Sequence, residues 1–246
     1  MVKKRPRVIS LVPSWTETLL AADVLVVGRS RFCIHPDEHI KDIPVVGGTK
    51  SIDLIKIQNL KPDFVILDRQ ENTVQTADEL ARHNIQMLVS DVVGFESLKV
   101  SLNLLATQLE APSLKSIADR YALVVKRVDQ KKFLSQLIQN SIPIPEIHSR
   151  HVDYVIWKNP FMVIGANTFI AENLKLIGIE PRHQQKYPEI SEDELKKSFC
   201  LFSSEPFPFA KSFSELQQRG FQGVVVDGEK LSWFGIRNLN FLESSV

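Results

Sequence analysis

The sequence predicts an α/β fold of two Rossmann-like lobes with central parallel sheets, joined by one long rigid α-helix, with a ligand cleft between the lobes. Short apolar segments alternate with helical segments over residues 1–95 and again over residues 141–246, and residues 96–140 between them have helical periodicity. Strands buried on both faces read as continuous apolar runs, which is typical of parallel sheets. We therefore expect an N-terminal lobe, a helical linker and a C-terminal lobe with these boundaries.

The N-terminal lobe opens with the apolar run VISLV at residues 8–12, which predicts the first strand. Ser14 follows where a helix N-cap belongs, and Glu17 stands three residues later, as in a capping box. The later elements read as strands at 24–28, 64–68 and 85–91 and as helices at 51–60, capped by Ser51, and 76–84. Ligands of open α/β sheets bind beyond the carboxyl ends of the strands, so the residues that follow each strand are candidates for a site.

The linker is predicted from leucines at three- and four-residue spacing, such as Leu102, Leu105 and Leu109. The helical pattern is broken at Ala111-Pro112, and no glycine occurs between residues 95 and 164. A helical connection of this kind is a stiff spacer, unlike the flexible linkers that are rich in glycine and serine.

The C-terminal lobe is predicted from strands at 151–157, 199–204 and 223–228 and from a helix at 166–179. Trp157 and Phe161 stand in a loop beside a glycine, and Trp233 stands in a similar segment further on. Aromatic side chains in loops rich in proline and glycine indicate either a binding surface for a large flat ligand or packing that anchors the loops.

The composition excludes several classes of function. With 30 Lys and Arg against 29 Asp and Glu, the net charge is +1, which leaves no excess to neutralise nucleic acid or an anionic membrane. No apolar run is long enough to predict a transmembrane helix. The start MVKKRPR followed by VISLVPSW does not read as a signal peptide, because Pro13, Trp15 and Glu17 interrupt the apolar run. We expect a cytoplasmic protein, or a periplasmic one if the true precursor is longer.

The octapeptide RFCIHPDE at residues 31–38 raises three alternatives: a metal site, a nucleophile or the wall of a pocket. A Cys33-x-His35 pair alone is weak evidence for metal, because zinc takes four ligands and no second close pair is present. The segment VGGTKS at 46–51 likewise favours a turn over a phosphate loop, since its spacing departs from the P-loop pattern.

Several motifs in order resemble one family along essentially the whole chain: RVISLVPSWTETL, VVGRSRFCIHP, VGGTKSIDLIKIQNLKPDFVI, IWKNPFMVIGANTFI, YPEIS, SEPFPF and VDGEKLSWFGIR. They are similar to the helical-backbone metal receptors, the class III periplasmic substrate-binding proteins, and most of all to a cobalamin-binding-like subgroup. The resemblance implies two α/β lobes joined by a long helix, and a ligand that is a metal chelate.

By position, the resemblance implies a ligand cleft lined by residues from both lobes: Ser14, Trp15, Phe32, His35, Glu71, Asn72, Trp157, Phe161, Trp233 and, as a polar contact, Arg237. His35 stands where the family has an aromatic residue, so an imidazole nitrogen there could coordinate a metal centre, with Cys33 as a soft ligand nearby. The cofactor is open, with cobalamin or another metal chelate as the expected ligand.

Two further positions bear on partners. Transport receptors of this family present one acidic residue on each lobe to the membrane permease, and the corresponding residues here are Ile55 and Asp193. A missing rim charge weakens the steering of two proteins toward each other. We therefore expect docking to a permease to be doubtful.

The leading prediction is a binding protein, not an enzyme, for a corrinoid such as cobalamin or for another metal chelate such as an iron–siderophore or haem, without coupling to a transporter. The alternatives are a periplasmic receptor of an ABC importer, or an enzyme that uses Cys33, His35 and Glu71 on a small metabolite.

Overall fold

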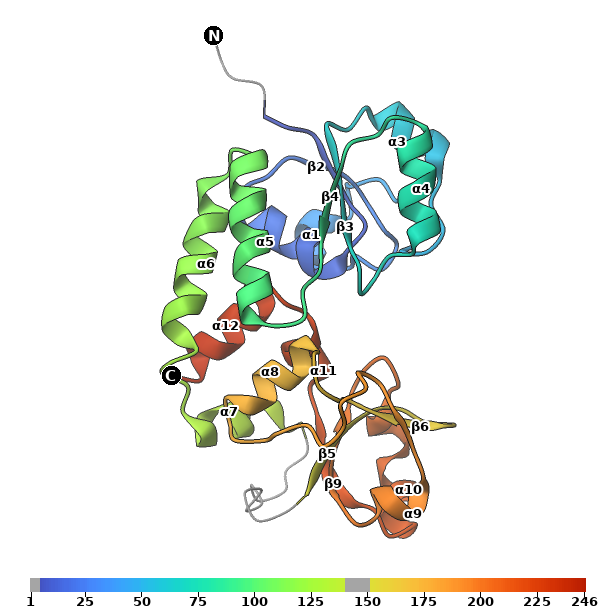
Figure 1. Ribbon diagram of the computed structural model, residues 1–246, viewed down its shortest axis with the longest axis vertical. Coiled ribbons are helices and arrows are strands. Elements are labelled where there is room, and N and C mark those ends of the chain that lie inside the picture. The colour runs from blue at the N-terminus through green and yellow to red at the C-terminus, as the bar shows by residue number, and fades with distance from the viewer. Residues whose placement is uncertain (1–4, 140–150) are drawn as a thin grey trace. The chain divides into compact units, whose positions relative to one another are not determined.

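The computed structural model describes residues 5–139 and 151–246, and it confirms the predicted α/β class with two separate sheets. The chain divides into two compact units (Figure 1). Unit 1 consists of Met1–Ala122 and Trp233–Leu239, and unit 2 consists of Leu123–Ser232 and Asn240–Val246. In the described parts of the chain no helix has both the length and the apolar character needed to cross a membrane.

The sheet of unit 1 has four strands in the order β2-β1-β3-β4, and every neighbouring pair is parallel. The strands are β1 (Val8–Ser10), β2 (Val26–Arg29), β3 (Phe64–Asp68) and β4 (Met87–Ser90). Because they run in the same direction, the loops that follow them all leave from one edge of the sheet. This carboxyl edge is where the candidate site begins.

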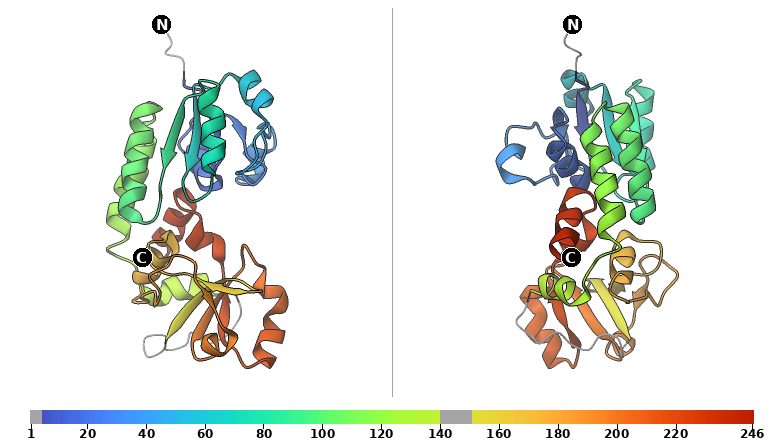
Figure 2. Two further views of the ribbon diagram at one scale, coloured as in Figure 1. Left: turned by 45° about the vertical axis from the view of Figure 1, so that its right-hand side comes forward. Right: turned by 90° about the vertical axis from the view of Figure 1, so that its left-hand side faces the viewer.

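Helices cover both faces of this sheet (Figures 1 and 2). On one face lie α3 (Leu54–Leu60) and α4 (Val74–Arg82), whose Ile57 and Leu80 pack with Val65 and Leu67 of β3. On the other face lie α1 (Pro13–Ala21) and α5 (Phe95–Gln108). A short helix, α2 (Asp37–Ile40), follows the loop after β2. The residues of β3 alternate between the two cores, as the period of a strand requires.

Two predicted helix caps are wrong. Helix α1 has Val12 at its N-cap and Pro13 in its first turn, without a side-chain cap, so Ser14 lies inside the helix and no capping box forms with Glu17. Proline is favoured at the first helical position because its missing N–H would have no partner there. Helix α3 is capped by Asp53, which accepts the N–H of Lys56 at 3.1 Å, and Ser51 precedes the helix.

The predicted linker is three helices, α5, α6 (Pro112–Val124) and α7 (Gln130–Leu137); the break at Ala111-Pro112 was predicted, and the one before α7 was not. The first break has a local cause, since Glu110 adopts a left-handed conformation with φ 52° and Pro112 then starts a new helix. The second break precedes Asp129, whose carboxylate caps α7.

The sheet of unit 2 has five strands in the order β7-β6-β5-β8-β9. Strands β5 (Val152–Trp157), β8 (Phe199–Ser203) and β9 (Gln222–Val226) are parallel, as predicted. Strands β6 (Phe161–Val163) and β7 (Glu189–Ile190) are antiparallel additions, so this sheet is mixed rather than wholly parallel. Residues 158–160 turn the chain from β5 into β6, a hairpin in the stretch that was predicted as a loop.

The remaining elements complete unit 2 and link it to the end of the sequence. They are α8 (Phe169–Lys175), α9 (Glu192–Leu195), η2 (Phe209–Ser212), α10 (Phe213–Gln218), α11 (Gly228–Ser232) and α12 (Ile236–Ser244). One core of this unit is rich in phenylalanine, with Phe161, Phe202, Phe209 and Phe221 buried together.

The segment Trp233–Leu239 belongs to unit 1 through close contacts with Thr18 of α1 and Tyr121 of α6. The N–H of Ile236 donates to the Thr18 hydroxyl at 3.0 Å, and the Tyr121 hydroxyl donates to the carbonyl of Gly235 at 2.7 Å. Gly235 has φ 83°, and a Cβ there would stand 2.0 Å from the Thr18 hydroxyl oxygen. Both the conformation and the close approach therefore require glycine.

Asp68, the last residue of β3, is a buried carboxylate that organises the loop behind it. Its oxygens accept hydrogen bonds from the Ser90 hydroxyl at 2.6 Å, the Gln70 N–H at 2.8 Å and the Val92 N–H at 3.1 Å. Burial raises the pKa of Asp68 above its ordinary value, against the opposing effect of these hydrogen bonds.

We expect Thr18→Val to lower the free energy of unfolding by about 1 to 2 kcal/mol, because the partly buried N–H of Ile236 loses its acceptor. Thr107→Val is the matched control, since the Thr107 hydroxyl donates to Asn103 on an exposed part of α5; it should change stability by less than about 0.5 kcal/mol. Urea denaturation of both variants measures the difference. Equal changes in the free energy of unfolding of the two variants would show that the hydrogen bond from Ile236 to Thr18 adds no more stability than that of an exposed hydroxyl.

The raised pKa of Asp68 predicts a pH dependence of stability. The folded state holds the proton more tightly than the unfolded chain, so the contribution of Asp68 to stability falls as the pH rises from about 4 through its folded pKa. We expect the unfolding free energy of the wild type, relative to Asp68→Asn, to decrease over this window. A relative stability that is flat or rises there would contradict the environment described for Asp68.

Candidate functional site

The loop after β2 presents apolar side chains at the carboxyl edge of the unit 1 sheet. The exposed fractions alternate along it: 51% for Phe32, 0% for Cys33 and 49% for Ile34. The N–H of Cys33 donates to the carbonyl of Ser30 at 3.1 Å, and this turn buries the thiol while its two neighbours are exposed. The sequence analysis predicted Phe32 as a site residue and overlooked Ile34, which the same alternation identifies.

The Cys33 thiol is a hydrogen-bonded part of the core. The Thr16 hydroxyl donates to its sulfur at 2.9 Å, and the Ser30 hydroxyl lies 3.2 Å away. Burial raises the pKa of the Cys33 thiol, with smaller opposing effects from these hydroxyls. This environment disfavours the thiolate that a nucleophile or a metal ligand needs.

His35 and Trp233 form an aromatic pair within unit 1, although the sequence analysis placed Trp233 in the C-terminal lobe. Their ring centroids are 5.3 Å apart with an interplanar angle of 67°, an edge-to-face arrangement. The His35 side chain is 24% exposed, and its Nδ1 lies 3.4 Å from a carboxylate oxygen of Asp37. A ligand at this edge of the sheet would therefore meet two rings in fixed mutual orientation.

Arg237 supports this pair rather than facing open solvent. Its guanidinium lies 5.1 Å from the centre of the Trp233 ring and donates to both carboxylate oxygens of Glu17, at 2.8 and 3.0 Å. A two-bond ion pair fixes the guanidinium plane. The predicted ligand contact of Arg237 is thus committed to Glu17, a residue that the sequence analysis read only as half of a capping box.

The loop after β3 is tied down by Asn72. The Asn72 amide donates to the carbonyl of Thr49 at 2.8 Å, and its oxygen accepts the N–H of Asp68 at 2.9 Å. The amide therefore joins this loop to the one around Thr49, which leaves it little capacity for a ligand. Glu71, beside it, is exposed at the same edge.

Two predicted residues lie in the core of unit 1. Trp15 has no exposed surface, and its indole N–H donates to the Ser90 hydroxyl at 2.8 Å while its ring packs edge-on against Phe234 at 5.0 Å. Ser14 is 5% exposed. Trp15 therefore builds the support behind the carboxyl edge and does not reach a ligand in this conformation.

The predicted aromatic residues of unit 2 also divide into exposed and buried groups. Trp157, at the carboxyl end of β5, is 40% exposed and meets Phe207 edge-on with centroids 5.8 Å apart. Phe161 is 7% exposed and packs at 5.3 Å against Phe221, so it belongs to the core. Phe207 follows β8 at the same edge of the sheet; its place in the Pro-rich segment SEPFPF is the signal that could have identified it.

The glycines of VGGTKS form a turn, as the favoured interpretation predicts. Gly47 has φ 118°, and a Cβ there would stand 2.5 Å from the carbonyl oxygen of Ser51. The N–H of Gly48 donates to that same carbonyl at 2.6 Å. Helix α3 begins only at Leu54, so its N-terminus is separated from the glycines.

Metal and permease contacts stay predictions. Over residues 5–139 and 151–246, no three His, Cys, Asp or Glu side chains gather around a point that could hold a metal ion. Ile55 is 71% exposed near the start of α3, and Asp193 is exposed in α9. The surface around Ile55 thus presents an apolar side chain where the receptors that the chain resembles carry an acid.

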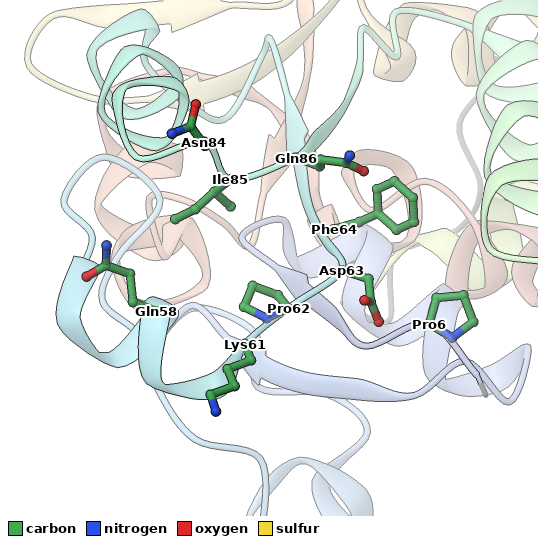
Figure 3. Close-up of a pocket in the computed structure, with 9 residues that line it drawn as sticks. All are labelled: Pro6, Gln58, Lys61, Pro62, Asp63, Phe64, Asn84, Ile85 and Gln86. Carbon is green, nitrogen blue, oxygen red and sulfur yellow. The ribbon is translucent and has the colours of Figure 1, made fainter.

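A shallow depression of about 640 Å³ lies at the opposite edge of the unit 1 sheet (Figure 3). Its lining comes from the amino ends of strands and from helix ends: Pro6, Gln58, Lys61, Pro62, Asp63, Phe64, Asn84, Ile85 and Gln86. Asp63 already accepts the N–H of Arg7 at 2.7 Å. None of the predicted site residues lines this depression, and its chemistry is that of ordinary polar loops.

Comparison with known families gives one match that covers most of the chain. The model of the family described as "Periplasmic binding protein" matches residues 8–198. Among curated proteins, the vitamin B12-binding protein of Salmonella typhi is 34% identical over 107 residues, which is 44% of this chain and 40% of that protein. The vitamin B12-binding protein of Pectobacterium carotovorum is 32% identical over 108 residues, 43% of this chain and 39% of that protein. The matched region thus spans less than half the length of these relatives.

Solved structures share the fold over nearly the whole chain. The periplasmic vitamin B12-binding protein BtuF of Vibrio cholerae has a TM-score of 0.71 at 18% identity, covering 98% of this chain and 95% of its own. A periplasmic haem-binding protein of Pseudomonas aeruginosa has a TM-score of 0.76 at 20% identity, with 98% and 92% covered. The names of these proteins do not support the expected cytoplasmic location. Because the family model covers residues 8–198, the chain belongs to the periplasmic binding protein family.

Proposed function

We propose that this protein binds a flat metal chelate, such as a corrinoid, a haem or an iron–siderophore, and that it acts as a binding protein rather than an enzyme. One observation carries the proposal: each unit exposes an aromatic side chain at the carboxyl edge of its sheet, Phe32 at 51% and Trp157 at 40%. The family and the relatives named for vitamin B12 support the class of ligand. Whether the two edges face each other across the predicted cleft stays a prediction.

The energetics of this ligand class suit these residues. A flat macrocycle has large apolar faces, and removing them from water is favourable by about 25 cal/mol per Å². Phe32 and Ile34 are each about half exposed, so a ligand could remove this apolar surface from water. The rings of His35 and Trp233 are held in place by the Arg237 guanidinium, which packs on Trp233. Rings that are fixed before the ligand arrives lose little conformational entropy on binding.

A second candidate is a periplasmic receptor that delivers its ligand to a membrane permease, which the named periplasmic proteins of the same fold favour. The apolar Ile55, 71% exposed where the resemblance implies an acid, favours a binder that is not coupled to a transporter. Cell fractionation, followed by a test for a complex with the permease, separates the two.

An enzyme built on Cys33 requires a reactive thiol, and the structure describes the opposite. We expect native Cys33 and Cys200 to resist iodoacetamide from pH 7 to 9 and to react fully in 8 M urea, because burial raises the pKa of both thiols. Mass spectrometry of the labelled peptides measures each site. Fast native labelling of Cys33 near neutral pH would revive the enzyme interpretation.

The exposed aromatic side chains at the carboxyl edges of the sheets predict which substitutions weaken ligand binding. We expect Phe32→Ala and Trp157→Ala each to weaken binding of cobalamin or haem by about five- to thirtyfold, since a contact with a ring is worth about 1 to 2 kcal/mol. Tyr187→Ala is the control, because Tyr187 is also 40% exposed but precedes β7, which is separated from β5 and Trp157 by strand β6. Isothermal titration calorimetry measures all four proteins. No micromolar binding of any chelate by the wild type would remove the proposed ligand class.

A further inference from the structure

Among the arginines near the exposed aromatic residues of unit 1, Arg31 and Arg237 differ in their partners. The guanidinium of Arg237 is held by both oxygens of Glu17. The guanidinium of Arg31 has no carboxylate within ion-pair distance among the described residues, and its one hydrogen bond is a long one, 3.5 Å to the Ser51 hydroxyl. Arg31 therefore keeps an uncompensated positive charge at the carboxyl edge of the sheet.

The place of this guanidinium is set by its neighbours. Its central carbon lies 5.3 Å from the centre of the Phe32 ring, a cation–π distance. On another side it lies against Gly48, where a Cβ would stand 2.9 Å from a terminal guanidinium nitrogen. The backbone N–H of Arg31 also donates to the carbonyl of Gly47 at 2.8 Å, which fixes the start of the side chain. The charge is thus held beside an exposed ring before any ligand binds.

We propose that Arg31 and Phe32 form a subsite for a carboxylate on the rim of a flat metal chelate, so that this protein prefers chelates with acidic side groups to those with neutral amides. The inference rests on the proposed function and adds the charge of the ligand to it. A guanidinium is planar and presents paired donors that match a carboxylate, while the neighbouring ring accepts the apolar rim of the macrocycle. A neutral amide gains only part of this interaction.

Among the described residues, two neighbouring cationic groups, unlike Arg31, already have carboxylate partners. Arg237 is neutralised by Glu17, and His35 has the Asp37 carboxylate 3.4 Å from its Nδ1. The glycine at position 48 leaves space for the Arg31 guanidinium, whereas a larger residue there would displace this guanidinium.

The test compares ligands that share one macrocycle and differ in whether a side group is a carboxylate or its neutral amide or ester. We expect wild-type protein to bind the monocarboxylic acid of cyanocobalamin about fivefold more tightly than cyanocobalamin, and ferric protoporphyrin IX about fivefold more tightly than its dimethyl ester. Raising the salt from 50 mM to 500 mM should reduce this preference, because salt screens exposed charges. Titration calorimetry or the visible absorbance of the chelate measures both.

Substitutions test which residues cause the preference for acidic chelates. Arg31→Met should abolish the preference for the acids, so that the acid and the neutral form of each chelate bind with equal affinity. Gly48→Ala should have a similar effect by pushing the guanidinium aside, and it should have no further effect in the Arg31→Met background, as a double-mutant cycle requires for one shared interaction. Arg82→Met is the control: it removes the same charge from the last turn of α4, and it should leave the preference intact.

The outcomes separate this inference from the proposed function. If chelates bind but acids and amides bind equally, or if Arg31→Met and Arg82→Met behave alike, the subsite is overturned and the proposed function stands. If no chelate of either charge binds the wild type, the proposed function fails and this inference fails with it.

Discussion

The close packing of Gly235 on Thr18 is the constraint on which the candidate site depends. The backbone can approach α1 this closely only because position 235 has no side chain, and the Thr18 hydroxyl then accepts the N–H of Ile236. That contact fixes the segment Trp233–Leu239 in unit 1. Trp233 thereby reaches His35, Phe234 packs on the buried Trp15, and Arg237 reaches Glu17. One backbone contact thus positions three side chains with different tasks.

The two units use the same principle with different chemistry. In each, a more exposed aromatic ring stands at the carboxyl edge of parallel strands: Phe32 in unit 1 and Trp157 in unit 2, where Phe207 packs edge-to-face against it. Unit 1 adds charge, with one arginine neutralised and another left without a carboxylate partner. Apolar surface provides affinity, whereas the charges decide which side groups of a ligand are tolerated.

Sequence patterns predicted the parallel strands well, because runs such as FVILD are apolar without interruption and are bounded by turn residues. Sequence patterns failed where neighbouring residues could each start or cap the same helix. Helix α1 starts at Pro13 and is not capped by Ser14, and Asp53 rather than Ser51 caps α3. In unit 2 the hairpin at Asn159-Pro160 was missed, since β6 and β7 are too short to show a period of their own.

The candidate site was predictable only in part. Resemblance placed Phe32, His35 and Trp157 on exposed or half-exposed positions, yet it could not tell that Trp15 and Phe161 are core, because burial depends on partners that are distant in sequence, such as Ser90 and Phe221. The pairing of Glu17 with Arg237 joins residues 220 positions apart, and no local pattern reports it.

The division of α12 between the units has a consequence for synthesis on the ribosome. Domains usually fold in the order in which they emerge. Unit 1, however, lacks Phe234 against Trp15 and the backbone partner of Thr18 until residues 233–239 have been translated, which is after every strand of the unit 2 sheet. Until those residues are translated the contacts on α1 are incomplete, so unit 1 gains its full set of packing contacts only at the end of synthesis.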